Sequence, residues 1–336
     1  MLRPSLTLLV AAACLTARSA EPLFQLPTAN RAIFEAGGEA RFFAPTVGKT
    51  WVAGTFGCVR TEGRQLHEGV DILHQKTDRR GEPIDPVMAV ANGTVVYVNT
   101  HSGLSNYGNY IVIRHAVDGL TLCSLYAHLA AIQPGLRAGS EVHAGEVIAT
   151  MGRTTNTRAS IGKDRAHLHL EFDFQVNPRY ADWHSRNREG ERNDHGNWNG
   201  RNLLGLDPWN LFLEQRRAGG KFSPARWVRG QAELCRVFVK ATDFPWLRAN
   251  PGLIRPNPRA QKEGAAGYEL ALNFMGLPFE CTPRAASEMK SLASSQVLYV
   301  NEAEQKQRSC RKLLRQTAGR WELAPAGTEL LNLLLY

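Results

Sequence analysis

Two short segments of the sequence hold the residue types of a metal site. The first is HEGVD at 67–71, and the second is HLHLE at 167–171. Successive side chains of a β-strand point to opposite faces, so His167 and His169 share one face. His67 and Asp71 are also an even number of residues apart, and they converge if their segment is extended or turns sharply at Gly69. The four side chains are therefore able to meet in one cleft.

Two imidazoles and one carboxylate are typical ligands of a catalytic zinc site, in which the fourth position is left to water. Zinc bound in this way lowers the pKa of the water to about 7 and polarises a carbonyl group. A further histidine beside the metal would act as a base or hold the oxyanion, and His128 is the candidate. The residues alone leave open whether His167 or His169 binds the metal. Glu171 either orients an imidazole or is an ordinary strand carboxylate.

Short strands are expected to position these residues. Between residues 51 and 175, β-branched and aromatic runs alternate with Gly, Pro and Asn, as at 87–98, 110–115, 122–128 and 167–174. Regular short strands separated by turn residues predict a mainly β fold, an antiparallel sheet or sandwich that forms a groove.

The order of these segments resembles that of the lysostaphin-type zinc metalloendopeptidases, which cut peptidoglycan peptides. The matching segments are FGCVR at 56–60, HEGVD at 67–71, PVMAVANGTVV at 86–96, GNYIVIRH at 108–115, YAHL at 126–129, VHAGEVIA at 142–149 and HLHLEF at 167–172. The resemblance covers roughly residues 51–175. It implies that zinc is held by His67, Asp71 and His169. It also implies that His167 is the general base and that His128 helps to stabilise the tetrahedral intermediate.

The sequence departs from this family in three places. The link at 153–166 is longer and more basic than the short Gly/Ser/Thr-rich link of the family, which leaves the shape of one cleft wall open. The polar segment after Val176 has no counterpart in the compact family core. The last third of the chain resembles no family that we recognise.

The N-terminus has the layout of a secretory signal peptide, with Arg3, a mostly apolar stretch at 6–15 and small residues up to Ala20. We expect export to the periplasm, cell envelope or extracellular space, and lipid attachment at Cys14 is the alternative to cleavage. The mature chain would keep an odd number of cysteines, so at least one thiol is free, and the sequence does not give the pairing. These are Cys58, Cys123, Cys235, Cys281 and Cys310.

We expect five regions along the chain. They are a signal peptide at 1–20, an N-terminal arm at 21–50, a peptidase domain at 51–176, a Trp/Asn-rich insertion at 177–219 packed on that domain, and a small α+β accessory domain at 220–336. In the accessory domain the sequence predicts strands at 235–239 and 296–300, helices at 284–293 and 302–316, and an apolar helix that begins at Thr328.

The insertion and the arm offer further groups to a substrate or metal. The rings of Trp183, Trp198 and Trp209 and several Asn amides suit a substrate groove, although these rings would equally pack the segment onto the β domain. His184 and His195 are weaker candidates for substrate contact. The arm is a weak candidate for a latch in which Asn30 offers its amide to zinc. Among the other histidines, His115 is expected to be structural, and those at 74, 101 and 143 are expected at the surface.

The positive charge lies at one end of the chain. Residues 216–336 hold 19 Lys and Arg against 10 Asp and Glu, whereas residues 1–215 are balanced at 21 each. This asymmetry predicts a surface attracted to an anionic wall polymer or a membrane surface, not to nucleic acid, or else a solvated basic face. No apolar run is long enough to cross a bilayer. The oligomeric state is not determined by the sequence.

These features predict an exported zinc metalloendopeptidase that hydrolyses an amide bond in the peptide part of peptidoglycan. The alternative is a catalytically silent member of the same fold that binds the wall or regulates another hydrolase. A third hypothesis, a polyanion-binding module, leaves the histidines unexplained. The sequence does not identify the bond: a stem-peptide crosslink, a glycine bridge or a non-wall protein.

Overall fold

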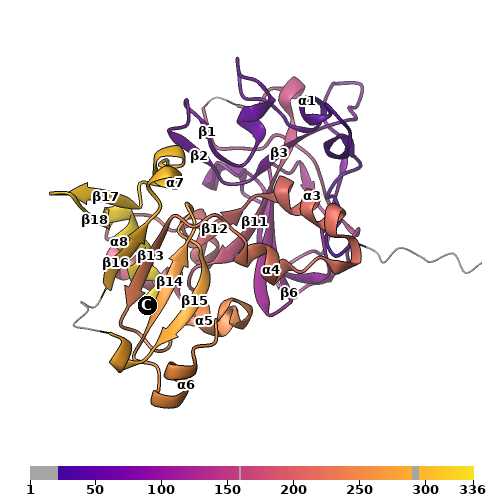
Figure 1. Ribbon diagram of the computed structural model, residues 1–336. Coiled ribbons are helices and arrows are strands. Elements are labelled where there is room, and N and C mark those ends of the chain that lie inside the picture. Colours follow the sequence, from indigo (N-terminus) through magenta and orange to yellow (C-terminus); the bar gives the residue numbers. More distant parts are fainter. Residues whose placement is uncertain (1–21, 159, 290–294) are drawn as a thin grey trace, which may run out of the picture.

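The computed structural model describes residues 22–158, 160–289 and 295–336. The predicted signal peptide and Cys14 lie outside the described residues. The fold is mainly antiparallel β, as expected, with two groups of strands that lie next to each other (Figure 1). Within the described ranges, no helix is both long and apolar enough to span a membrane.

The first group is built around a seven-stranded antiparallel sheet in the order β12-β11-β7-β6-β5-β9, with β3 also paired to β11. The strands are β3 (Val70–Leu73), β5 (Gly93–Asn99), β6 (Tyr110–Val117), β7 (Leu120–Ala127), β9 (Glu141–Val142), β11 (His167–Gln175) and β12 (Leu203–Leu206). A smaller sheet has the order β4 (Pro86–Met88), β10 (Val147–Thr150), β8 (Ala131–Ile132). The hairpin of β1 (Gly57–Arg60) and β2 (Gln65–His67) completes this half.

Strand β11 determines where the histidines lie. Its first residues pair with β3 on one side and with β7 on the other, and its second half pairs with β12. In this register His169 lies opposite Asp71 of β3 and next to Ala127 of β7. All but the last residue of β11 are buried, because both faces of the sheet are covered. The strand pairing therefore brings residues about 100 positions apart into one site.

The N-terminal arm packs onto this sheet. It contains a 3-10 turn (Ala32–Phe34) and the short helix α1 (Glu39–Phe42), and Phe42 and Phe43 are fully buried. The amide nitrogen of Asn30 donates to the carbonyls of Arg41 and Leu73 at 3.0 and 3.3 Å, and its oxygen accepts from a backbone N–H. The hypothesis of an Asn30 latch on zinc is therefore wrong, because both polar atoms of this amide hold the arm to the fold.

The segment after β11 contains helices α2 (Tyr180–Asn187) and α3 (Pro208–Ala218), with β12 between them. Its aromatic rings mostly pack against the protein. Trp183 is buried against Tyr180, and the ring centroid of Trp209 lies 4.9 Å from that of Phe43. Trp198 packs on the apolar cluster at the outer face of the sheet. Packing accounts for these three rings, and the stacking of sugars on them has no support here.

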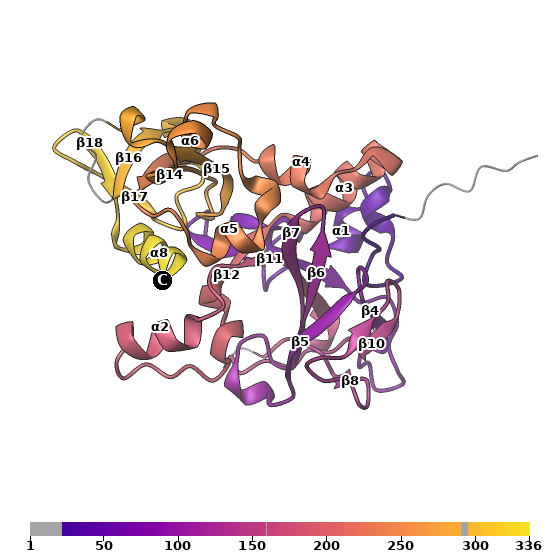
Figure 2. The same cartoon turned by 90° about the horizontal axis from the view of Figure 1, so that it is seen from below.

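The last third of the chain, from about residue 220 onward, is called the C-terminal half here. It is a second antiparallel sheet with short helices around it (Figures 1 and 2). The sheet order is β15 (Pro278–Arg284), β14 (Gly267–Leu272), β13 (Cys235–Val239), β16 (Ser295–Val300), and β17 (Leu314–Thr317) pairs with β18 (Arg320–Leu323). The helices are α4 (Pro224–Arg229), α5 (Pro245–Ala249), α6 (Pro258–Glu263), α7 (Glu302–Gln307) and α8 (Pro325–Leu335).

The predicted strands at 235–239 and 296–300 are confirmed, but two helix predictions need correction. The helix predicted at 284–293 is wrong for its first six residues, because residue 284 ends β15 and a 3-10 turn follows at 286–288. The rest of the predicted helix lies outside the described residues. The helix predicted at 302–316 ends at Gln307. Beyond it, Cys310 forms a disulfide with Cys58 of β1, and Lys312 has a positive φ of 50°. The apolar C-terminal helix is present but begins at Pro325, which suits its first turn.

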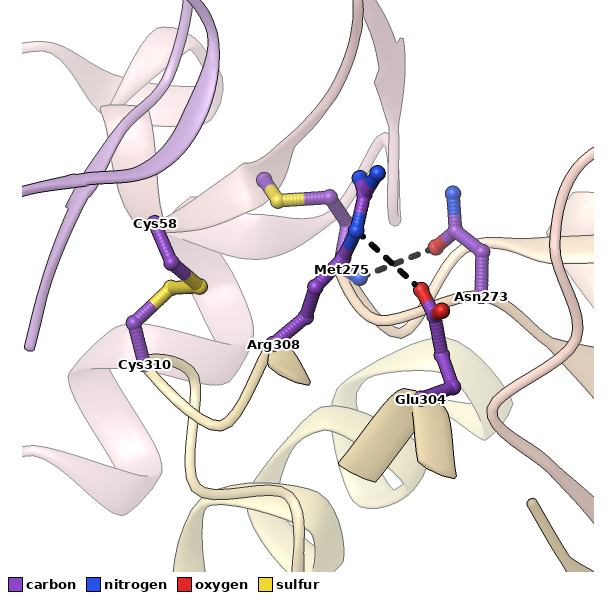
Figure 3. Close-up of a disulfide and its surroundings, with 6 residues drawn as sticks. All are labelled: Cys58, Asn273, Met275, Glu304, Arg308 and Cys310. Atoms are coloured by element: carbon purple, nitrogen blue, oxygen red, sulfur yellow. Dashed lines mark hydrogen bonds and ion pairs between the residues drawn. A yellow bond between two sulfur atoms is a disulfide. The ribbon is translucent and has the colours of Figure 1, made fainter. Parts of the chain in front are cut away.

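A disulfide between Cys58 of β1 and Cys310 joins the two halves (Figure 3). The rings of Phe56 and Phe274 contact each other beside it, with centroids 5.7 Å apart. Cys123, Cys235 and Cys281 are buried free thiols. The expectation of at least one free thiol is thus confirmed, and the disulfide fixes the chain around residue 310 next to the strand that leads into the histidine site.

Candidate metal centre

Three side chains meet at the start of β11. His67 Nε2, Asp71 Oδ1 and His169 Nδ1 lie 2.9 to 3.1 Å from one another, and all three residues are buried. They come from β2, β3 and β11. Gly69, between the first two, passes so close to β11 that a Cβ atom there would lie 2.2 Å from the carbonyl oxygen of Leu170. Only glycine, which has no Cβ atom, allows these two segments to approach so closely.

The outer atom of each side chain is already engaged. His67 Nδ1 donates to the carbonyl of Thr55 at 2.8 Å, and Asp71 Oδ2 accepts from Arg60 at 2.6 Å. His169 Nε2 donates to Glu171 Oε1 at 2.7 Å. Three inner atoms are left to face one another, and these atoms form a group able to hold a metal ion. Glu171 therefore orients an imidazole, the first of its two predicted roles.

The spacing of the inner atoms suits a small cation. Tetrahedral ligands at about 2.0 Å from zinc lie about 3.3 Å from one another, a few tenths of an ångström more than the separations here. Two nitrogens and one carboxylate oxygen are also a donor set that zinc prefers. The residues present thus fit a zinc ion in both geometry and donor chemistry.

The electrostatics of the site favour positive charge. Burial by itself would raise the pKa of Asp71, but His67 and His167 hold it well below its usual value. Burial opposes protonation of His169, yet its hydrogen bonds to Asp71 and Glu171 raise its pKa to about 10. Metal ligands must be deprotonated, so a metal ion would replace this proton.

His167 and His128 lie next to the three inner atoms. His167 Nδ1 donates to the carbonyl of Arg165 at 2.7 Å, and His128 Nδ1 donates to that of Thr154 at 2.8 Å. Their ring centroids are 4.9 Å apart. Burial lowers the pKa of both rings, and positive charge on the neighbouring histidines lowers that of His128 further. Each ring therefore presents an unprotonated Nε2 at neutral pH.

The backbone holds His128 in a conformation that few residues adopt. Its φ is +62°, in the left-handed region, at the point where the chain leaves β7. Its backbone N–H donates to the carbonyl of Tyr107 at 2.8 Å. Backbone strain of this kind persists only where the surrounding structure imposes it.

Three residues at the site were not predicted from the sequence. Arg60 pairs with Asp71, and the ring of Tyr107 lies 5.6 Å from that of His169. Asp173 lies further along β11, and neither of its buried carboxyl oxygens has a hydrogen-bond partner among the described residues. Burial and the charge of Glu171 raise its pKa well above the usual value. The alternation that pairs His167 with His169 on one face extends to residue 173 and was the available signal.

Two basic residues of the link at 153–166 pair with Glu82 of another loop. Arg153 makes two hydrogen bonds to Glu82, at 2.8 and 2.9 Å, and Lys163 lies 3.2 Å from the same carboxylate. These contacts lower the pKa of Glu82 to about 2. Both link residues thus share one carboxylate, which offsets part of their positive charge.

The remaining histidines lie away from the three inner atoms. His115 is structural, as expected, because its ring bonds to the carbonyl of Asn92 and to Ser124 inside the sheet. His195 is held by Tyr97 and by a backbone carbonyl, and His184 is buried. The histidines at 101 and 143 are exposed as expected, but His74 is half-buried and bonds to a backbone carbonyl.

Comparison with known proteins places this region in a family. The model of Peptidase family M23 matches residues 65–181. This range includes His67, Asp71, His128, His167 and His169. Lipoprotein NlpD of Yersinia enterocolitica is 38% identical over 104 residues, which are 30% of this chain and 93% of that protein. Murein hydrolase activator NlpD of Escherichia coli K12 is 39% identical over 137 residues, 40% of this chain and 29% of that protein.

A relative named as an enzyme also matches. DD-carboxypeptidase/endopeptidase Mpg of Neisseria meningitidis is 35% identical over 106 residues, 32% of this chain and 21% of that protein. Among solved structures, a zinc containing peptidase from Vibrio cholerae is 29% identical over 32% of this chain and 26% of that one, with a TM-score of 0.24. The chain spans less than a third of the Escherichia coli and Neisseria relatives. The lysostaphin-type resemblance is confirmed, and the chain belongs to peptidase family M23.

Proposed function

We propose that the protein is a zinc metalloendopeptidase that hydrolyses an amide bond in the peptide part of peptidoglycan. The observation that carries the proposal is the arrangement of the three inner atoms of His67, Asp71 and His169, whose outer atoms are all engaged elsewhere. Two further histidines with unprotonated Nε2 atoms lie beside them. A metal site without catalytic function would not need this second pair.

Zinc held by these residues would act as a Lewis acid on the scissile carbonyl and would lower the pKa of a water molecule to about 7. His167 is the base that takes the proton of the attacking water on Nε2, because its Nδ1–H is fixed on the Arg165 carbonyl. The lowered pKa keeps this ring neutral and ready to accept. When the amide bond breaks, the same Nε2 donates the proton to the leaving amine.

His128 has a different part in this mechanism. Its Nδ1–H is also fixed, so its Nε2 must take up a proton from the solvent before it can donate to an oxyanion. Negative charge developing on the carbonyl oxygen favours that protonation. The ring is thus neutral in the resting protein and stabilises the tetrahedral intermediate only as charge develops.

The relatives support export of the protein to the periplasm or cell envelope. The NlpD relatives are named as lipoproteins and as an activator of murein hydrolases, and murein is the envelope polymer peptidoglycan. A disulfide between distant residues is typical of proteins in an oxidising compartment, which fits this location. The signal peptide and the choice between cleavage and lipid attachment at Cys14 remain predictions.

The second candidate function is regulation of another hydrolase without catalysis. The name of the Escherichia coli relative favours it. All five residues that the catalytic mechanism uses are present here, namely His67, Asp71, His128, His167 and His169. Peptidase activity therefore remains the first proposal, and the basic C-terminal half remains a proposed surface for an anionic wall polymer or membrane.

Two alanine variants distinguish these functions. The His169→Ala protein is expected to lose both zinc and the release of soluble peptides from purified peptidoglycan. The His167→Ala protein is expected to keep zinc but to lose peptide release, because its imidazole moves the proton without holding the metal. Retained peptide release by the His169→Ala protein would rule out the metal assignment, and absence of release by the unaltered protein in the presence of bound zinc would favour the regulatory function.

A further inference from the structure

A polar pocket of about 480 Å³ lies beside the metal centre and between three parts of the chain. Glu68, which follows His67, and Tyr107, whose ring lies 5.6 Å from that of His169, belong to the catalytic half. A second wall is formed by residues 195, 199–201 and 203 of the insertion. Met275 and Arg311 of the C-terminal half form the third wall. A volume of this size is typical of a small-ligand site.

Arg311 is fixed in this pocket by its neighbour in the chain. Cys310 is bonded to Cys58 of β1, and Met275 lies near the same disulfide (Figure 3). The backbone that carries Arg311 is therefore held against the strand that leads to His67. In the compact family core no C-terminal domain would supply this side chain.

The guanidinium of Arg311 has no partner in the described part of the chain. Its Nε atom is buried without a hydrogen bond, and no carboxylate of a described residue lies within 4 Å of the group. The charges of Glu68 and Glu329 act on it only at longer range. Other arginines nearby are paired, Arg308 with Glu304 and Arg201 with Glu191.

Arg311 is half-buried, and desolvation of its Nε atom is not repaid by an ion pair or hydrogen bond, which is costly. Such a group in a cavity beside a reactive centre is explained if a ligand supplies the missing acceptors. A planar guanidinium binds a carboxylate through two parallel hydrogen bonds. The geometry thus indicates an anionic group on the ligand, next to the bond that reacts.

We propose that this pocket is a specificity subsite in which Arg311 binds a free carboxylate of the peptide substrate. The inference rests on the proposed peptidase function, and it makes the C-terminal half part of substrate selection. An acidic peptide would be bound with its carboxylate on Arg311 and its scissile amide at the metal centre. A peptide with an amide in place of that carboxylate would leave the guanidinium unpaired and bind more weakly.

The test uses soluble peptides released from purified peptidoglycan, before and after chemical amidation of their carboxyl groups. Binding is measured to the full-length His167→Ala protein, so that it does not depend on turnover. We expect the free-carboxylate peptides to bind about 10–100-fold more tightly than the amidated ones. The Arg311→Ala change in this protein should abolish the difference by weakening only the binding of the free-carboxylate peptides. Arg311→Lys should restore part of it.

Arg308→Ala is the matched control, because Arg308 lies on the same segment but pairs with Glu304 and stacks on Phe274. It should leave the carboxylate preference unchanged. Synthetic peptides amidated at only the C-terminal or only a side-chain carboxyl then identify which carboxylate is bound.

Several results would overturn the subsite. These are no binding of either peptide form, no preference in the unaltered site, a preference that survives Arg311→Ala, or an equal loss for both forms in that variant. A carboxylate preference in binding by a protein that cleaves no peptide would instead retain the subsite and refute the peptidase function.

Discussion

Replacement of Glu171 by Gln isolates the contribution of the carboxylate behind the metal centre. The Glu171 oxygen lies 2.7 Å from His169 Nε2, and both groups are buried. Gln has nearly the same volume and still offers an oxygen acceptor, but it removes the negative charge. A hydrogen bond to a charged group is worth about 1.5–3 kcal/mol, compared with about 1 kcal/mol for a neutral one.

The lost charge should therefore weaken zinc binding by about 10-fold, up to about 100-fold if the amide presents its NH2 group to the imidazole. The assay is a competition titration of zinc between the protein and a chromophoric chelator at neutral pH. Asp173→Asn is the matched control, because this carboxyl lies on the same strand, has a raised pKa and does not bond to His169. Equal zinc affinity of the Glu171→Gln and unaltered proteins would refute the reasoning that this carboxylate orients and polarises the ligand.

Three other predictions concern the surroundings of the site. Gly69→Ala should lower stability by about 1–3 kcal/mol and weaken zinc binding, because the new Cβ would lie 2.2 Å from the Leu170 carbonyl. Replacement of Cys58 and Cys310 by Ser should lower the free energy of unfolding by about 2–5 kcal/mol in a denaturant titration, since the bond joins residues 252 positions apart. The unaltered protein should lose stability as pH rises, and Asp173→Asn should abolish this loss. Thermal unfolding between about pH 4 and pH 8 measures the difference.

The sign of the pH effect follows from the raised pKa of Asp173. Between the unfolded pKa of about 4 and the higher folded pKa, the folded protein binds a proton that the unfolded chain has lost. Stability therefore falls as pH rises through this window, by up to about 1.4 kcal/mol per pH unit. An identical pH slope in the Asp173→Asn variant would contradict this explanation.

Controls are available for the other two variants. Gly103→Ala introduces a Cβ with no atom within 4 Å and at an ordinary φ, so it should change neither stability nor zinc binding. Unaltered zinc binding and stability of the Gly69→Ala protein would show that β3 does not need its close contact with β11. For the disulfide, a reductant should lower the stability of the unaltered protein to that of the double serine variant and should leave the variant unchanged.

The local part of the site could be predicted from the sequence. The even spacing within 67–71 and 167–171 determines which side chains share a face, and β11 forms as its alternating pattern indicates. The antiparallel sheet and several accessory strands follow from the same kind of pattern. The resemblance to the peptidase family supplied the choice of His169, and the engagement of its Nε2 by Glu171 fits that choice.

The contacts between distant segments could not be predicted. The pairing of Arg60 with Asp71 depends on how the β1–β2 hairpin folds over β3, and the pairing of Cys58 with Cys310 depends on how the two halves meet. The prediction of a helix at 302–316 was wrong beyond Gln307 for the same reason, since tertiary contacts outweighed the helical composition there. The pocket that contains Arg311 exists only once these contacts have formed.

The central claim is tested most directly by the zinc content of the purified protein, together with its release of soluble peptides from purified peptidoglycan with and without a chelator. We predict one zinc per chain and a release that the chelator abolishes and that added zinc restores. Peptide release that survives complete removal of the metal would contradict the mechanism. A protein that binds no zinc and releases no peptides would contradict the assignment of the site.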